Sequence, residues 1–130
     1  MKTALVVGGA NGIGLAIATE LAKEEEVRKI YIVDRCTPQP EYHKDKFEYH
    51  IFDLNHSDYS IFAQFKDIDI LMITAGFGKL ALFKDVDERH IIESMNVNAT
   101  AVMRIIHCFY DKISSKADFF CGVMVSIAGF

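Results

Sequence analysis

Short apolar runs alternate along the chain with amphipathic stretches, and this alternation is the strongest pattern in the sequence. The apolar runs are rich in Val, Ile, Phe and Tyr and have few polar interruptions, as is typical of strands buried on both faces of a parallel sheet. We therefore predict five strands, at Thr3–Val7, Lys29–Val33, Phe47–Phe52, Asp69–Thr74 and Phe119–Val125.

The stretches between these runs carry apolar residues at helical spacing. In the first of them, Ile13, Ile17 and Leu21 recur every four residues and polar residues occupy the opposite face. Ser57 and Asp85 are the expected N-caps of the second and third helices. The predicted helices are Ile13–Glu25, Asp58–Phe65, a helix near Val86–Met95, and a last, longer helix that runs to about Ile113.

Strands that alternate with helices over short connections imply a parallel sheet with helices on both faces. Right-handed crossovers then give an open, doubly wound α/β sheet. The segment Arg35–Lys46, which contains two prolines, is the one clear loop. No linker or repeat divides the 130 residues, so we expect a single domain over residues 1–130.

Composition and charge narrow the classes of function. The chain is 51% hydrophobic, which argues against disorder, and its net charge of −4 without a basic run disfavours nucleic-acid binding. No apolar stretch reaches the ~18 residues that a membrane span requires. The three cysteines and five histidines lack the spacing of a disulfide framework or a metal site. We expect a reduced, cytoplasmic protein that binds no metal.

The first predicted strand leads directly into a glycine-rich loop, Gly8–Gly14, and then into a helix. A pyrophosphate binds to backbone N–H groups at such a helix start, and a Cβ in the turn would hold the backbone too far away. The first acid in the helix is Glu20, which leaves the positive helix end for a ligand. An ordinary βα turn is the alternative, but the strand before and the helix after favour dinucleotide binding. The predicted contacts are Gly8, Asn11, Gly12, Ile13 and Gly14.

An acidic residue follows the second predicted strand. Asp34 comes 20 residues after Gly14, where a carboxylate accepts hydrogen bonds from the adenosine ribose hydroxyls. The same charge would repel a 2′-phosphate, so Asp34 favours NAD(H) over NADP(H). Arg35 could reach a 2′-phosphate, although a local pair with Asp34 or a solvent-facing side chain is the simpler interpretation. A structural turn residue remains the alternative for Asp34.

The spacing of Gly8, Gly12 and Gly14 resembles the Thr-Gly-x3-Gly-x-Gly motif of the short-chain dehydrogenase/reductase family, with Val7 at the threonine position. The resemblance implies a Rossmann-type sheet of about five strands in the order 3-2-1-4-5, truncated relative to the family. It also implies that Asp53 and Leu54 lie beside the adenine ring. The family's Asn-Asn-Ala-Gly motif is matched by its second half alone, at Ala75 and Gly76, after Ile73 and Thr74.

Two catalytic residues follow from the same resemblance. Asn98 matches the helix asparagine that holds a water in the proton relay, and Ser126 matches the serine that hydrogen-bonds the substrate oxygen. A surface asparagine and a polar strand end are the plainer alternatives. The family's Tyr-x-x-x-Lys pair lies beyond this serine, whereas the sequence ends at Phe130. The same spacing at Tyr42 and Lys46 falls in a loop on the adenosine side, which we interpret as solvated.

Three functional interpretations result. The first is the N-terminal fragment of an NAD(H)-dependent oxidoreductase, inactive alone, that would transfer hydride between nicotinamide and a small carbonyl or secondary alcohol substrate. The second is a non-catalytic dinucleotide-binding or regulatory module, and the third is a degraded gene product without function. An apolar edge at Phe119–Val125 also predicts a homo-oligomer or an aggregation-prone chain.

Overall fold

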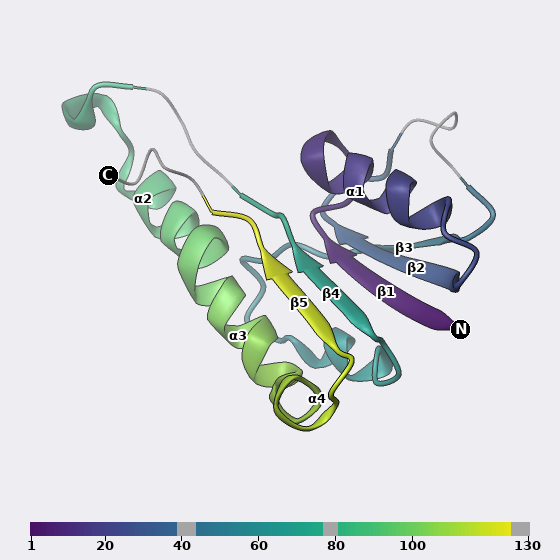
Figure 1. Ribbon diagram of the computed structural model, residues 1–130. Coiled ribbons are helices and arrows are strands. Elements are labelled where there is room, and N and C mark those ends of the chain that lie inside the picture. Colours follow the sequence, from purple (N-terminus) through teal and green to yellow (C-terminus); the bar gives the residue numbers. More distant parts are fainter. Residues whose placement is uncertain (39–43, 77–80, 126–130) are drawn as a thin grey trace.

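The computed structural model describes residues 1–38, 44–76 and 81–125, which form a five-stranded parallel sheet (Figure 1). The strand order is β3-β2-β1-β4-β5, so the predicted fold class and topology are confirmed. Each predicted strand agrees with the observed one to within two residues at either end. The strands are β1 (Lys2–Val7), β2 (Val27–Asp34), β3 (Phe47–Ile51), β4 (Ile70–Ile73) and β5 (Phe120–Val123).

The first predicted helix is present as α1 (Gly12–Ala22), whereas the later ones differ in detail. The segment predicted as a helix at Asp58–Phe65 is the short 3-10 helix η2 (Ser60–Gln64). The third predicted helix, near Val86–Met95, is present as α2 (Glu88–Met95). In place of one long final helix, the structure has a π turn at Asn96–Thr100, α3 (Ala101–Cys108) and α4 (Tyr110–Ser115).

Both predicted helix caps were assigned to the wrong residue. Asp87, rather than Asp85, caps α2, because its carboxylate accepts a hydrogen bond of 3.0 Å from the backbone N–H of Arg89. Before η2, the Asp58 carboxylate accepts a 2.8 Å hydrogen bond from the Ser60 N–H, and Ser57 is not the cap. In both cases an aspartate one or two residues after the predicted cap accepts a hydrogen bond from a backbone N–H group at the start of the helix, as such side chains commonly do.

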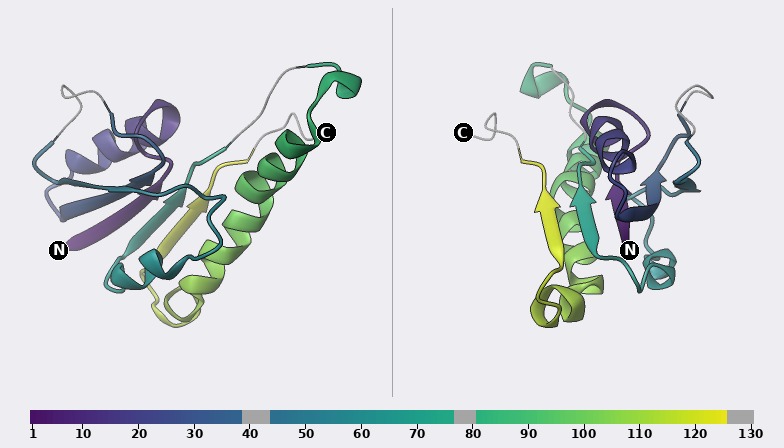
Figure 2. Two further views of the ribbon diagram at one scale, coloured as in Figure 1. Left: turned by 180° about the vertical axis from the view of Figure 1, so that it is seen from behind. Right: turned by 45° about the vertical axis from the view of Figure 1, so that its right-hand side comes forward.

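The side chains of β1 alternate between two hydrophobic cores. Leu5 and Val7 face a core that η2, β4 and α3 complete, whereas Ala4 and Val6 face a core that β2 and α1 complete. All four side chains are 1% exposed or less. Figures 1 and 2 show the matching arrangement, with α1 on one face of the sheet and α3 on the other. β1 is therefore buried on both faces, as its continuous apolar run predicts.

β5 is the least covered strand of the sheet. It pairs with β4 along one edge, and the described residues provide no partner strand for its other edge. Phe120 at its start is 57% exposed, and Val123 and Met124 are also exposed. The expected open apolar edge is therefore present, whereas the expected oligomer stays a prediction.

At the amino ends of the strands, a buried carboxylate joins β1 to the segment before β5. Asp69 accepts a 2.9 Å hydrogen bond from the Thr3 N–H and forms an ion pair with Lys116. Burial disfavours the ionised form of Asp69, but the bonds from Lys116 and Thr3 outweigh it and lower the pKa of the carboxyl. This contact fixes the end of the sheet opposite the candidate site.

Candidate functional site

A cleft of about 360 Å³ opens at the carboxyl ends of the strands. Residues at or just beyond the ends of all five strands line it, which is where open parallel sheets bind ligands. The cleft brings together every residue that the sequence predicts for cofactor binding. These residues are Gly8, Asn11, Gly12, Ile13, Gly14, Asp34, Arg35, Asp53, Leu54, Ala75 and Gly76.

The glycines of the loop have different physical roles. Gly8 has φ +88°, and a Cβ there would lie 2.6 Å from the Ala75 backbone nitrogen. A Cβ on Gly14 would lie 2.2 Å from the Gly8 carbonyl oxygen, so any side chain at Gly14 would push the loop away from the helix. Gly12 also has a positive φ, of +56°, but a Cβ there would meet no described atom within 4 Å. Gly8 and Gly14 thus allow close packing, whereas Gly12 faces open space on the cleft side.

The start of α1 is suited to an anion. Within the described structure, Asn11 makes no side-chain capping bond to the helix, and the first turn contains no acidic residue. The Asn11 amide instead points to the Cys36 sulfur, at 3.8 Å. The first N–H groups of a helix carry partial positive charge and have no partner within the helix. This end of α1 therefore offers a cradle of backbone N–H groups with glycines on both sides.

Asp34 connects the end of β2 to the glycine loop. One carboxylate oxygen accepts a 3.0 Å hydrogen bond from the Ala10 N–H, and the other lies 3.4 Å from the Cys36 N–H and 3.7 Å from its sulfur. Desolvation and the adjacent Asp34 charge raise the pKa of the Cys36 thiol. The thiol therefore stays protonated at neutral pH, and Asp34 supplies the negative charge of this wall.

Thr74 was not predicted as a site residue, yet it holds the loop in place. Its hydroxyl donates a 2.9 Å hydrogen bond to the Val7 carbonyl and lies 3.2 Å from the Gly8 carbonyl. Thr74 stands where the family resemblance leads one to expect asparagine, and its hydroxyl ties β4 to the loop after β1. The remaining cleft residues that the sequence did not indicate are mainly apolar wall residues next to strand ends: Val7, Val33, Cys36, Phe52, Val97 and Met124.

Asn98 lies on the π turn, beside the cleft rather than in its lining. Its side-chain nitrogen is 3.1 Å from the Ser94 hydroxyl, and its side-chain oxygen is 3.5 Å from where a Cβ on Gly76 would be. The π turn widens the helix at this point, a distortion that is frequent at functional sites. Ser126, the other predicted catalytic residue, lies outside the described residues, as does Tyr42.

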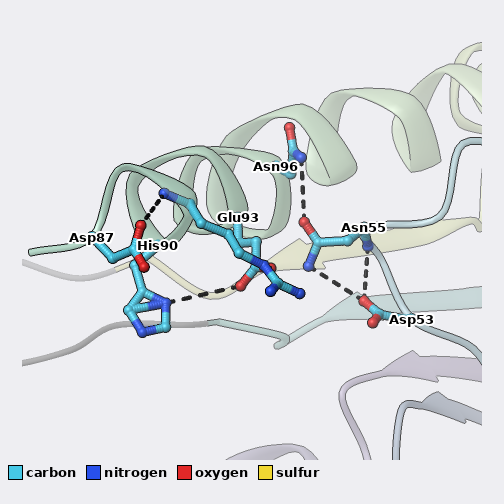
Figure 3. A network of polar contacts seen from close by, with 7 residues as sticks. Asp53, Asn55, Asp87, His90, Glu93 and Asn96 are labelled. Atoms are coloured by element: carbon cyan, nitrogen blue, oxygen red, sulfur yellow. Dashed lines mark hydrogen bonds and ion pairs between the residues drawn. The ribbon is translucent and has the colours of Figure 1, made fainter.

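A chain of side-chain hydrogen bonds links the cleft to the same π turn (Figure 3). One Asp53 oxygen accepts bonds from the backbone N–H and the side-chain amide of Asn55, at 2.9 and 3.3 Å. The Asn55 side-chain oxygen accepts a 3.2 Å bond from Asn96, the first residue of the π turn. Asn55 therefore connects the cleft wall at Asp53 to the turn that carries Asn98.

The sequence as a whole matches one family model, described as short chain dehydrogenase, over residues 2–128. The chain belongs to the short-chain dehydrogenase family. No curated protein matches it in sequence. Members of this family bind a nicotinamide dinucleotide.

Solved structures of short-chain dehydrogenases share the fold. The bulky-bulky ketone specific alcohol dehydrogenase from Comamonas testosteroni aligns with TM-score 0.87 and 20% identity over 100% of this chain and 57% of its own. A short chain dehydrogenase family protein from Francisella tularensis aligns with TM-score 0.75 and 19% identity, over 85% and 46%. A short-chain dehydrogenase/reductase from Burkholderia multivorans, solved with bound NADP, aligns with TM-score 0.72 and 21% identity, over 96% and 58%.

This short-chain dehydrogenase chain therefore spans about half the length of the solved structures that it matches. Across the described parts of the chain, no group of three His, Cys, Asp or Glu residues is placed to hold a metal ion. No helix in these parts is long and apolar enough to cross a membrane.

Proposed function

We propose that this chain binds NAD(H) in the cleft, as the cofactor-binding part of an oxidoreductase that acts on a small carbonyl or secondary alcohol. The observation that carries the proposal is that one cleft gathers all the predicted cofactor residues around an uncapped helix start. Such a start binds phosphate groups well. When bound, the nicotinamide would accept or donate the hydride of the reaction.

The glycine loop supports the phosphate part of the proposal. Gly12 leaves open space where a pyrophosphate would approach the backbone, and the N–H groups of Gly12, Ile13 and Gly14 begin the helix. Asp53 and Leu54 form the part of the wall that we assign to the adenine ring. The residues present therefore fit the group that the family binds.

Asp34 supports the choice of NAD(H). Its carboxylate lies in the cleft wall and is held by the Ala10 N–H, so a ribose 2′-phosphate would meet a fixed negative charge. Like charges at short distance disfavour binding. Arg35 also lines the cleft and carries the opposite charge, so the affinities of the chain for both cofactors have to be measured.

Asn98 is the residue we assign to the proton relay, as the holder of a water beside the nicotinamide end, and Ser126 is assigned to the substrate oxygen. The position of Asn98 next to Gly76 supports its part of the assignment.

The three cysteines are free thiols, which agrees with the reducing, cytoplasmic setting that we propose. The exposed edge of β5 supports pairing between copies of the chain.

Calorimetric titration with NAD⁺ and NADP⁺ tests the proposal. We expect NAD⁺ to bind at least about tenfold more tightly, which corresponds to about 1.4 kcal/mol. Asp34→Asn keeps an oxygen for the Ala10 N–H but removes the charge, so it should bring the two affinities close together. Gly14→Ala should abolish binding of both, because its methyl group would lie 2.2 Å from the Gly8 oxygen.

Two results would contradict the proposal: no dinucleotide binding by the wild-type chain, or tighter binding of NADP⁺ than of NAD⁺. NAD-preferring binding without turnover of simple ketones or alcohols is expected both of the inactive fragment and of the non-catalytic module, and it would argue against a degraded gene product.

A further inference from the structure

The loop after β3 is held against the helix that carries Asn98 at two separate points. The first is the hydrogen bond of 3.2 Å between the side chains of Asn55 and Asn96. The second is Arg104 of α3, whose guanidinium lies 3.6 Å from the centre of the Tyr59 ring and donates to the carbonyls of His56 and Ser57, at 3.3 and 2.6 Å. The loop cannot move far from the helix while both contacts persist.

These contacts also fix the cleft wall that the loop provides. The Tyr59 hydroxyl donates a 2.6 Å hydrogen bond to the Leu54 carbonyl, and the Tyr59 ring packs edge-on against Phe52. Phe52, Asp53 and Leu54 all line the cleft. The helix therefore supports the whole stretch of wall that the proposed function assigns to adenine.

The hydrogen bonds between Asp53, Asn55 and Asn96 have a defined direction. An Asp53 carboxylate oxygen accepts its bonds from the Asn55 N–H groups, so the Asn55 amide turns its nitrogen toward Asp53 and its oxygen toward Asn96. Asn96 must then donate. A side chain at position 96 that cannot donate would face the Asn55 oxygen without a bond, and the Asn55 amide could turn around only by breaking its bond to Asp53.

Asn96 opens the π turn, and the next two residues both lie at the site. Val97 lines the cleft, and Asn98 is adjacent to Gly76 on its rim. A restraint on the Asn96 side chain therefore acts on the residue directly before Val97 and two positions before Asn98. Figure 3 shows the path from Asp53 through Asn55 to Asn96 without interruption.

We propose that Asn55 and Asn96 are positioning residues that couple the adenine wall of the cleft to the π turn, so that an adenosine group bound at Asp53 orders the turn that carries Asn98. The inference rests on the proposed function, since it requires adenosine in the cleft. The ligand is a nucleotide that carries an adenine base and a ribose, and neither the nicotinamide nor the substrate is needed for the coupling.

Amide hydrogen exchange, measured by NMR on the whole chain with and without saturating AMP, tests this coupling. AMP carries the adenosine half alone and so cannot act on Asn98 through a nicotinamide. In the wild type we expect AMP to slow exchange severalfold both in the glycine loop and at the amides of residues 97–100. In Asn96→Ala, AMP should still slow exchange in the glycine loop, while the amides of residues 97–100 no longer respond.

Three variants separate coupling from a general loss of structure. Asn55→Ala lies in the loop rather than in the helix, and it should uncouple the turn to the same degree as Asn96→Ala. The double variant should show no further loss, because both changes break one connection. Asn96→Asp has nearly the size of asparagine but cannot donate, so it should uncouple the turn at least as fully as Asn96→Ala. Each variant should weaken AMP binding by about two- to tenfold, the range for one hydrogen bond.

Two results would overturn the inference in different ways. The coupling is wrong, and the binding site stands, if AMP slows amide exchange in the glycine loop of the wild type but leaves the exchange of residues 97–100 unchanged. The same conclusion follows if both single variants keep the full response of residues 97–100. If AMP changes no amide in the wild-type chain, the adenosine site is wrong, and the proposed function fails together with the coupling.

Discussion

β1 and β5 belong to one sheet and have similar apolar sequences, but they are packed very differently. Every residue of β1 from Thr3 to Val7 is buried, between two cores, and its carboxyl end leads into the glycine loop. β5 has no buried residue, and Phe120 is 57% exposed. An apolar run thus predicts a strand in both places, but the number of neighbours that cover it decides how much that strand stabilises the fold.

The largest expected loss of stability follows from the cavity that a substitution in β1 would create. Leu5→Ala removes a fully buried side chain from the core shared with η2 and α3, and it should lower the free energy of unfolding by about 2–5 kcal/mol. Urea denaturation followed by circular dichroism measures this change. Leu82→Ala is the matched control, because Leu82 is 66% exposed and its loss should cost less than about 0.5 kcal/mol. Equal losses in the two variants would contradict the contrast between buried and open regions.

The second expected effect on stability concerns Asp69, which connects β1 to the segment before β5 through Thr3 and Lys116. The pKa of the folded carboxyl is below its ordinary value, so the ionised form stabilises the fold above about pH 4. That stability is lost as the pH falls from there through the lowered pKa. At neutral pH, Asp69→Asn should cost about 1–3 kcal/mol, because charged hydrogen bonds are replaced by weaker ones.

Denaturation midpoints between pH 2 and pH 7 test this prediction, with Asp67→Asn as a control at an exposed neighbouring position. Asp69→Asn should flatten the decline in stability on the acid side, whereas Asp67→Asn should leave it largely unchanged. An unaltered acid decline in Asp69→Asn would show that other carboxyl groups cause it.

The sequence predicted the parts of the fold that depend on long-range burial. Runs such as Ala4–Val7 are typical of strands buried inside a sheet, so the strand positions followed from them, whereas the strand order followed from the resemblance to the short-chain dehydrogenase/reductase family. The caps and the helix types were less predictable, because they depend on single hydrogen bonds between neighbouring residues. Asp85 and Asp87 are both suitable caps by sequence, and only the backbone path selects Asp87.

The candidate site also contains some features that the sequence predicts and others that it does not. The glycine loop and Asp34 were predictable because their chemistry fixes their spacing along the chain. Thr74 and Val97 were not, since each reaches the cleft only because separate strands and helices converge there. The bond between Asn55 and Asn96 joins residues 41 positions apart, and two asparagines give no sequence signal of such a contact.

The smallest expected effect on stability is at the edge of β5, where Phe120→Lys should change the free energy of unfolding by less than about 0.5 kcal/mol. Phe120 is 57% exposed, so little burial is lost. A lysine on an open edge opposes strand pairing between chains. Sedimentation should therefore show self-association in the wild type, as proposed for this edge, and smaller species in Phe120→Lys at equal concentration. A clean wild-type monomer would contradict pairing at β5, and a loss of stability as large as that of Leu5→Ala would contradict the contrast between the two strands.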